Sequence, residues 1–234
     1  MTPFALSSPL DAAALAGEFA HHGRVRIRNF LAASAAERLH QCLLDEVPWK
    51  LVCDERGTAV VLKDASRVSE QQIMPAVIGQ ARDRFQYLYC SYPMVTAYLR
   101  GDDPGLLLHR VLEWLNEPRL LELIRDITGI TTLRKADAQA TWYRPGHFLT
   151  LHDDGGATGE MRRVAYVLNL TRRWQADWGG LLHFVDERGD VAASWRPEFN
   201  TLVLFRVPVR HTVSQVAPFA GEPRFAITGW FRDS

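Results

Sequence analysis

The second half of the chain consists of short runs of β-branched and aromatic residues that are separated by turn residues. After Ile130 these runs include ATWYR, FLTLH, RRVAYVLNL, GGLLHFVD, NTLVLFR and RFAITGWF. Many short strands with turn signals between them are typical of a β-sandwich or a β-barrel. We therefore predict an all-β core of roughly 100 residues at the C-terminal end of the chain.

The first half contains most of the predicted helices. The helical spacing of apolar residues, together with helix-capping residues, predicts helices over 12–22, 33–46, 106–116 and 117–129. A weaker helical pattern covers 69–79, where Pro75 would break or kink the helix. Residues 24–31 alternate like a half-buried strand, and residues 49–62 resemble a hairpin with its turn at Arg56-Gly57. The aromatic segment 85–98 is compatible with a strand, with a loop, or with a segment that closes over a pocket.

No linker rich in glycine, serine or proline divides these two halves. We therefore predict one domain over residues 1–234, mainly β with α support. Residues 1–136 would form a mostly helical support, and residues 137–234 would form the catalytic β core.

Charge and cysteine content limit the classes of partner. The 27 basic and 27 acidic residues give a formal net charge of zero, which offers no electrostatic argument for nucleic acid. No apolar run approaches the about 18 residues of a membrane span, and the N-terminus lacks the features of a signal peptide. The three cysteines Cys42, Cys53 and Cys90 have no C-x-x-C spacing. We expect a cytoplasmic protein without nucleic-acid or membrane partners.

Two potential metal ligands lie close together in the second half. His152 and Asp154 are two residues apart in a segment that reads as extended, and side chains at i and i+2 of a strand share a face. Alternation favours Asp154 over the neighbouring Asp153, although an acidic pair can also cap the Gly155-Gly156 turn. His211, far downstream, is the best third ligand. Two histidines and one carboxylate suit a non-haem Fe(II) site with open coordination positions.

A second feature lies thirteen residues after His211. Arg224 stands inside the apolar run RFAITGWF, and an arginine is rarely buried without an anionic partner. Its guanidinium group can bind a carboxylate through two parallel hydrogen bonds, and a dicarboxylate co-substrate offers such a group. Thr228 shares the strand face of Arg224 and can add a hydroxyl donor.

Taken together, these residues resemble a known family. Tyr143, His152-x-Asp154, Trp178-Gly179-Gly180-x-Leu182, His211 and Arg224-x-x-x-Thr228-x-Trp230 follow one another in the order found in the Fe(II)- and 2-oxoglutarate-dependent prolyl hydroxylases. The block RRVAYVLNLTRRWQADWGGLLHF looks most similar to the branch of ribosomal-protein prolyl hydroxylases. The resemblance covers residues 137 to the C-terminus and implies a double-stranded β-helix, or jelly-roll, core flanked by N-terminal helices.

The resemblance also implies roles for individual residues. His152, Asp154 and His211 would bind Fe(II), and Arg224 would hold the distal carboxylate of 2-oxoglutarate with help from Tyr143 and Thr228. The resemblance further suggests that Tyr166 reaches this carboxylate, although in the oxygen-sensing branch the tyrosine stands one residue later, where this chain has Val167. Leu182 would line the co-substrate pocket, and Trp230 would pack beneath the site.

The implied reaction is hydroxylation of an unactivated C–H bond, most simply of a prolyl residue in a protein or peptide, with release of succinate and CO2. The cofactors would be Fe(II), 2-oxoglutarate and O2, with ascorbate as a candidate reductant. Three alternatives stay open: a hydroxylase of a free amino acid or other small molecule, a non-catalytic jelly-roll module that binds a metal or ligand, and a zinc hydrolase. The last of these gives no role to Arg224.

Overall fold

The computed structural model describes residues 4–55, 58–62, 67–155 and 161–233, so the predicted turn at Arg56-Gly57 and the residue Gly156 lie outside the described part. The helices are α1 (Ala12–His22), α2 (Ala33–Asp45), α3 (Arg67–Ala81), α4 (Met94–Arg100), α5 (Leu107–Leu115), α6 (Pro118–Thr128) and the short 3-10 helix η1 (Ala176–Trp178). The strands are β1 (Arg24–Arg28), β2 (Lys50–Glu55), β3 (Thr58–Leu62), β4 (Tyr87–Tyr92), β5 (Lys135–Ala136), β6 (Gln139–Tyr143), β7 (Phe148–His152), β8 (Arg162–Asn169), β9 (Leu182–Val185), β10 (Val191–Trp195), β11 (Thr201–Arg206), β12 (His211–Val213) and β13 (Arg224–Arg232).

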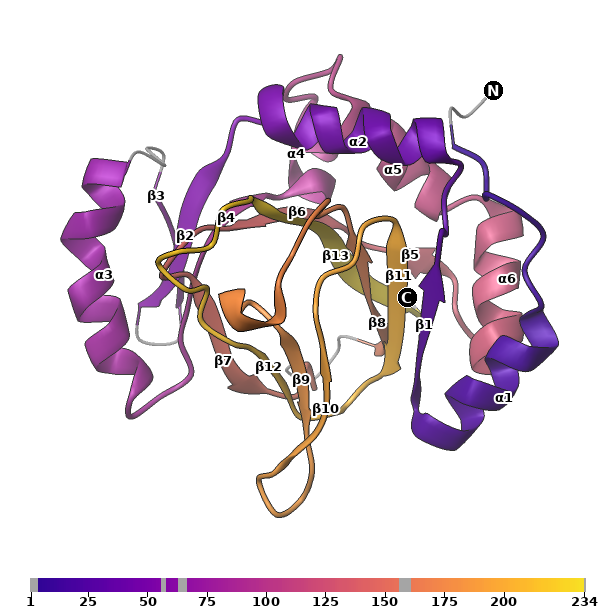
Figure 1. The fold of residues 1–234 in the computed structure, drawn as a ribbon. Helices are drawn as coiled ribbons and strands as arrows, with labels where there is room; N and C mark the ends of the chain where they lie inside the picture. The colour runs from indigo at the N-terminus through magenta and orange to yellow at the C-terminus, as the bar shows by residue number, and fades with distance from the viewer. Residues whose placement is uncertain (1–3, 56–57, 63–66, 156–160, 234) are drawn as a thin grey trace.

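These strands join in one curled antiparallel sheet. Its main path runs β1-β11-β8-β13-β6-β4-β7-β12-β9-β10, and β2, β3 and β5 pair off this path. In Figure 1 the sheet curls around the centre of the molecule, with α2, α4 and α5 above it, α3 on one side and α1 with α6 on the other. The first half of the chain is therefore more than a helical support, because β1 pairs with β11 and β4 pairs with both β6 and β7.

Local sequence signals explain most of the helices. The Asp11 carboxylate accepts a hydrogen bond from the backbone N–H of Ala14, and Gly23 ends α1 in the left-handed conformation that glycine tolerates. Of the two effects expected at Pro75, a break is wrong, because helix α3 continues through this residue. The aromatic segment 85–98, for which strand and loop stayed open, forms β4 and then α4.

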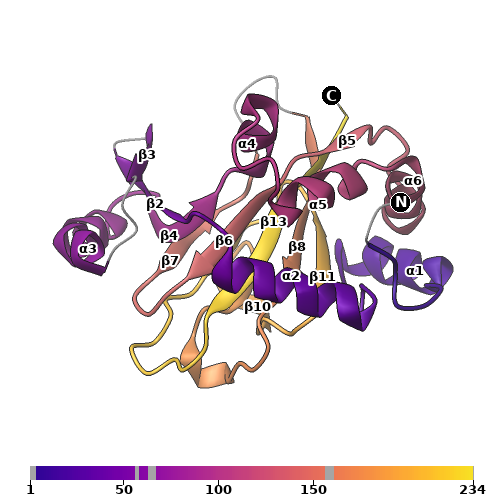
Figure 2. The same cartoon turned by 90° about the horizontal axis from the view of Figure 1, so that it is seen from above.

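The two faces of the sheet have different side chains. On β13, Phe225, Ile227 and Phe231 face the main hydrophobic core, which α1, α2, α5 and α6 complete. Figure 2 shows α2 and α5 lying across this side of the sheet. Arg224 and Thr228 point to the opposite, concave face, as alternation along a strand requires. The same strand thus supplies both the core and the cavity described below.

A smaller core lies between α3 and the strands β2 and β4. It contains Leu51, Cys53, Leu88 and Cys90. Beside it, the buried Glu70 carboxylate of α3 lies 2.9 Å from the Arg144 guanidinium and 3.3 Å from the His147 imidazole, both of which belong to the loop between β6 and β7. This buried ion pair fixes the loop that leads to His152. His147 thus contacts Glu70 beside the smaller core and not the His152 cluster.

No helix within the described residues is long and apolar enough to cross a membrane.

Candidate active site

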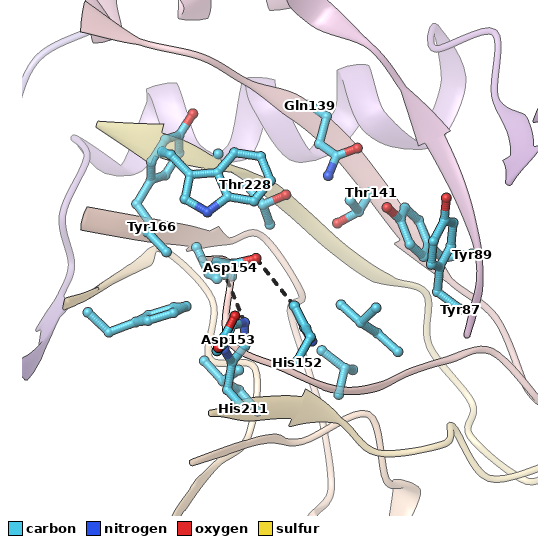
Figure 3. Close-up of a pocket in the computed structure, with 18 of the residues that line it drawn as sticks. Tyr87, Tyr89, Gln139, Thr141, His152, Asp153, Asp154, Tyr166, His211 and Thr228 are labelled. Atoms are coloured by element: carbon cyan, nitrogen blue, oxygen red, sulfur yellow. Dashed lines mark ion pairs between the residues drawn. The ribbon is translucent and has the colours of Figure 1, made fainter. Parts of the chain in front are cut away.

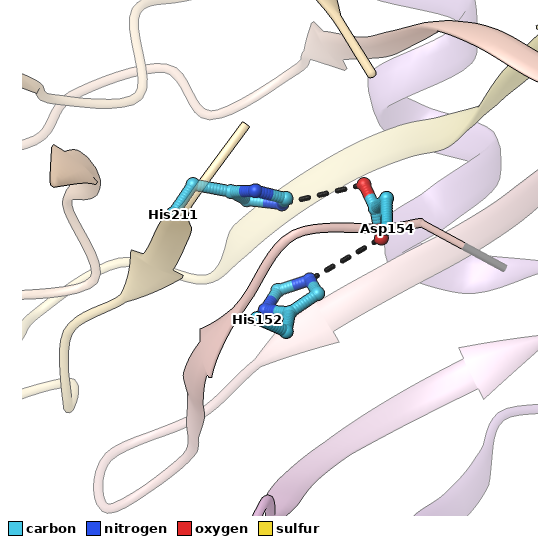
Figure 4. A group of neighbouring side chains, drawn as sticks. All are labelled: His152, Asp154 and His211. Atoms are coloured by element: carbon cyan, nitrogen blue, oxygen red, sulfur yellow. Dashed lines mark ion pairs between the residues drawn. The ribbon is translucent and has the colours of Figure 1, made fainter. Parts of the chain in front are cut away.

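His152, Asp154 and His211 converge at one end of the cavity on the concave face. His152 ends β7 and His211 begins β12, and the two residues are paired across these strands. The Asp154 carboxylate lies between the two imidazoles, with one oxygen 3.4 Å from Nε2 of His152 and the other 3.4 Å from Nε2 of His211. Figure 4 shows the three side chains pointing toward one another. One potential ligand atom from each residue lies within 4.8 Å of the others, which allows all three to contact one metal ion.

The conformation of Asp154 differs from the expected extended strand. Strand β7 ends at His152, and Asp154 has a φ of 61°, in the left-handed region. A tight bend, and not strand alternation, therefore brings its carboxylate back toward His152. Asp153 also lines the cavity, but its Oδ1 accepts a hydrogen bond of 2.9 Å from the backbone N–H of Gly155. The choice of Asp154 over Asp153 agrees with this geometry, but the reason given from strand periodicity was wrong.

The protonation of these groups fits a divalent metal. Nδ1 of His152 lies 2.9 Å from the carbonyl of Thr150, and Nδ1 of His211 lies 2.8 Å from the carbonyl of Val209. If each Nδ1 donates its proton to that carbonyl, each Nε2 presents a lone pair toward Asp154, as metal-binding histidines require. Burial lowers the pKa of His211 to about 4, so its imidazole is neutral at pH 7. Burial alone would raise the pKa of Asp154, but the side chains of His152, His211 and Trp230 outweigh burial, so this pKa is lowered.

Arg224 is buried at another part of the same cavity. It is 3% exposed, and its Nε donates a hydrogen bond of 2.7 Å to the carbonyl of Gly180. Its guanidinium lies 4.6 Å from the ring centre of Tyr143, and the Tyr143 ring stacks on Tyr89 at 5.1 Å. Among the described residues no carboxylate lies within ion-pair distance of Arg224. A buried cation that faces a cavity without a protein anion is suited to an anionic ligand.

The cavity between the two features has a volume of about 490 Å³, which is typical of a small-molecule site. Leu182, Thr228 and Trp230 line it. Several lining residues were not predicted from the sequence, and four of them carry polar groups: Tyr87, Tyr89, Gln139 and Thr141. In Figure 3 these four side chains lie on one side of the cavity and the His–Asp–His cluster lies on the other. Alternation of Tyr87 and Tyr89 with the core residues Leu88 and Cys90 was the signal that could have identified β4 as a cavity wall.

The predicted role of Tyr166 needs correction. Although Tyr166 borders the cavity, its ring belongs to the main core and lies 5.1 Å from the centre of the Phe231 ring. Its hydroxyl donates a hydrogen bond to the backbone carbonyl of Asp137. Tyr166 pairs with Gly229, five residues from Arg224 along β13. Val167, the next residue, packs with the interior cluster on the opposite face of β8. A shift of one residue along a strand changes the face, so Tyr166 does not reach the Arg224 end of the cavity.

Gly180 holds Arg224 in place, which leads to a testable prediction. It has a φ of 59°, and a Cβ atom there would lie 2.9 Å from Cδ of Arg224. We expect Gly180→Ala to displace the guanidinium and weaken binding of a dicarboxylate about tenfold, because a misplaced charge-assisted hydrogen bond loses on the order of 1.5 kcal/mol. Isothermal titration with 2-oxoglutarate and Mn(II) measures this change. Gly189→Ala is the matched control, because Gly189 has a φ of 92° but no atom within 4 Å of the added Cβ. An unchanged affinity in Gly180→Ala would contradict the positioning role.

A comparison with protein families assigns this arrangement. Residues 138–232 match the model of the 2OG-Fe(II) oxygenase superfamily. The C-terminal part of the chain is thus similar to a 2OG-Fe(II) oxygenase domain. The matched segment contains the three members of the His–Asp–His cluster and Arg224.

Two curated relatives are prolyl hydroxylases. The chain is 34% identical to prolyl 3-hydroxylase OGFOD1 of Mus musculus over 115 residues, which are 46% of this chain and 20% of the mouse protein. It is 28% identical to prolyl 3,4-dihydroxylase OGFOD1 of Ostreococcus tauri over 137 residues, which are 55% of this chain and 26% of that protein. The match thus spans about a quarter or less of the length of these relatives.

Solved structures confirm the predicted fold class. A prolyl-4-hydroxylase of Pseudomonas putida aligns with 95% of this chain and 99% of its own, with a TM-score of 0.61 and 22% identity. A prolyl hydroxylase of Trichoplax adhaerens, solved with a peptide fragment of hypoxia inducible factor, aligns with 95% of this chain and 89% of its own, with a TM-score of 0.65 and 20% identity. The curled antiparallel sheet with outer helices is thus the double-stranded β-helix of these proteins.

Proposed function

We propose that this protein is an Fe(II)- and 2-oxoglutarate-dependent hydroxylase that acts on a prolyl residue of a protein or peptide. The family match and the His–Asp–His cluster support the iron and the co-substrate. Both curated relatives are described as prolyl hydroxylases, which supports the prolyl residue as the target. The Trichoplax structure with its bound peptide supports a polypeptide substrate.

The observation that carries the proposal is the buried guanidinium of Arg224, which shares one cavity with the metal-binding cluster. A metal site alone would also suit a hydrolase. A buried arginine in the same cavity, with no ion pair among the described residues, favours an anionic group on the ligand. A dicarboxylate can satisfy both features at once, with one end at the metal and the other at Arg224.

In this proposal His152, Asp154 and His211 hold the iron, which with 2-oxoglutarate and O2 supplies the oxidising chemistry that yields succinate, CO2 and a hydroxylated product. Arg224 binds the distal carboxylate, and Tyr143 supports the guanidinium through its ring. The pKa of the Tyr143 hydroxyl is raised well above its usual value by burial, so it stays protonated and can donate a hydrogen bond to the same carboxylate. Thr228 and Leu182 shape the cavity between the two ends.

Succinate formation tests the proposal against its alternatives. Purified protein would receive Fe(II), 2-oxoglutarate and ascorbate, with a panel of prolyl peptides, free proline and other amino acids. We expect oxygen-dependent succinate, and a mass increase of one oxygen atom in a prolyl peptide. Hydroxylation of only a free amino acid would favour a small-molecule hydroxylase. Binding of metal and 2-oxoglutarate with no succinate under any substrate would favour a non-catalytic module.

A further inference from the structure

A second cavity opens beside the first on the concave face of the sheet. It has a volume of about 500 Å³ and six of its lining residues also line the first cavity: Tyr87, Tyr89, Gln139, Arg162, Thr228 and Trp230. The shared residues form a continuous wall between the two compartments. The co-substrate is a dicarboxylate of ten heavy atoms, and the substrate contributes one target residue to the metal site. These two groups together do not need two compartments of this size, so the second compartment is available to another part of the substrate.

The far wall of this second cavity comes from the first half of the chain. Lys50 and Val52 on β2, Ser91 on β4, and Pro93, Val95 and Thr96 at the start of α4 line it. On β2, the intervening Leu51 and Cys53 belong to the core beneath α3. Alternation along β2 therefore directs the Lys50 side chain into the cavity.

Two basic side chains, Lys50 and Arg162, belong to the lining of this cavity. Lys50 is half-buried and forms no ion pair with any residue that the structure describes. The guanidinium of Arg162 lies 3.8 Å from the ring centre of Trp230 on the opposite wall. Asp137 is the acidic residue of the lining, and Arg232 contacts its carboxylate at 3.3 Å. The Asp137 carboxylate also accepts the backbone N–H of Trp230 at 2.8 Å, so its charge is largely compensated.

The register of the sheet gives the distance between the two compartments. Lys50 pairs with Ser91 on β4, and Ser91 pairs with Thr141 on β6, which lines the first cavity. Two strand spacings separate Lys50 from Thr141, or about 10 Å, and one more spacing reaches β13. An extended peptide spans about 3.3–3.6 Å per residue, so these distances correspond to roughly three to four residues.

We propose that the second cavity is a specificity subsite in which Lys50 binds a carboxylate of the substrate a few residues from the hydroxylated position. This inference rests on the proposed function and extends it from a target residue to a flanking sequence. The carboxylate belongs either to an aspartate or glutamate side chain or to the C-terminus of a short peptide. Both groups offer the same chemistry to an ammonium group.

The test uses peptides bound to the full chain with Mn(II) and 2-oxoglutarate under anaerobic conditions, so that binding is measured without turnover. The probes are fluorescein-labelled prolyl peptides in which a glutamate is moved from two to five residues away on either side of the proline, each compared with glutamine at the same place. We expect at least one glutamate position to bind about threefold to tenfold more tightly than its glutamine partner, which is the range of a partly exposed ion pair. Amidated and free C-termini separate the two sources of the carboxylate.

Two cavity variants, with Lys135→Glu as their control, test whether this preference depends on the cavity. Lys50→Glu should remove or reverse the preference for glutamate and leave the affinity for the glutamine peptide within about twofold. Lys135→Glu makes the same charge change on the exposed strand β5 and should keep the preference. Thr96→Trp, at the exposed rim, should weaken binding of the long peptides by filling the compartment while binding of 2-oxoglutarate stays unchanged.

The outcomes separate this inference from the proposed function. Equal affinity for the glutamate and glutamine peptides at every position, or a preference that Lys50→Glu leaves intact, would overturn the subsite. Succinate formation with prolyl peptides would still support the hydroxylase in that case. Failure of the protein to bind 2-oxoglutarate would instead count against the proposed function.

Discussion

Replacing Asp154 with alanine should abolish binding of Fe(II) and of its spectroscopic substitute Mn(II). Asp154 supplies the anionic member of the cluster, and its two oxygens face both imidazoles at 3.4 Å. Mutation of a residue that only hydrogen-bonds to a metal ligand typically lowers metal affinity about 10–100-fold. Removal of the ligand Asp154 itself should therefore lower metal affinity more than about 100-fold. Isothermal titration or Mn(II) electron paramagnetic resonance measures the affinity directly.

Thermal unfolding gives an independent measurement of the same prediction. A metal that binds only the folded protein stabilises it by about 2.7 kcal/mol at a concentration of one hundred times Kd. The wild-type Tm should therefore rise when Mn(II) is added, while that of Asp154→Ala stays constant. Asp154→Asn is a useful second variant, because asparagine tolerates the left-handed backbone at this position and keeps the shape of the side chain.

Asp153→Ala is the matched control for both measurements. Its carboxylate bonds to the backbone N–H of Gly155 and not to the cluster, so metal affinity should stay close to that of the wild type. The reverse result, with Asp153→Ala losing the metal and Asp154→Ala keeping it, would contradict the assignment of the ligands.

Replacing Arg224 with alanine should weaken binding of 2-oxoglutarate by about 10²–10³-fold. Truncating one partner of a buried charge pair costs about 2–5 kcal/mol, and each 1.4 kcal/mol is a factor of ten. The anaerobic Fe(II) complex with 2-oxoglutarate has a weak visible charge-transfer band, and titrating this band gives the affinity. Arg224→Lys should fall between alanine and the wild type, because it keeps the charge but loses the planar fork.

Metal affinity separates this effect from a general disruption of the site. Arg224 contacts Gly180 and Tyr143 rather than the metal-binding cluster, so Arg224→Ala should bind Mn(II) about as tightly as the wild type. Absence of the band in the wild type, or an unchanged titration in Arg224→Ala, would contradict the assignment of the co-substrate site.

The alternation of side chains along strands explains why the positions of Arg224 and Thr228 could be predicted from the sequence. It also explains why the position suggested for Tyr166 was wrong. The period of two correctly placed Arg224 and Thr228 on one face of β13, because the residues between them are apolar and require a core. The same rule makes Tyr166 a core residue, since Val164 and Leu168 share its face of β8. Similarity to the family suggested that Tyr166 reaches the co-substrate carboxylate. The alternation of residues along β8 instead indicates a core position for its ring, which is where the ring lies.

Other features depend on contacts that no local pattern contains. The bend at Asp154 comes from a positive φ, which asparagine, aspartate and glycine adopt according to their tertiary surroundings. The continuation of α3 through Pro75 is likewise set by the tertiary structure, because the helix packs on β2 and β4. The second cavity brings together residues as distant in sequence as Lys50 and Trp230.

The position of β4 has a consequence for attempts to shorten this protein. The family match begins at residue 138, yet β4 lies between β6 and β7, and β1 covers the edge of β11. A fragment restricted to the matched segment would expose unpaired backbone N–H and C=O groups along three strands. Such open edges pair with strands of other molecules, so the excised segment should aggregate instead of folding as a smaller enzyme. Deletion studies on this chain should therefore keep both halves.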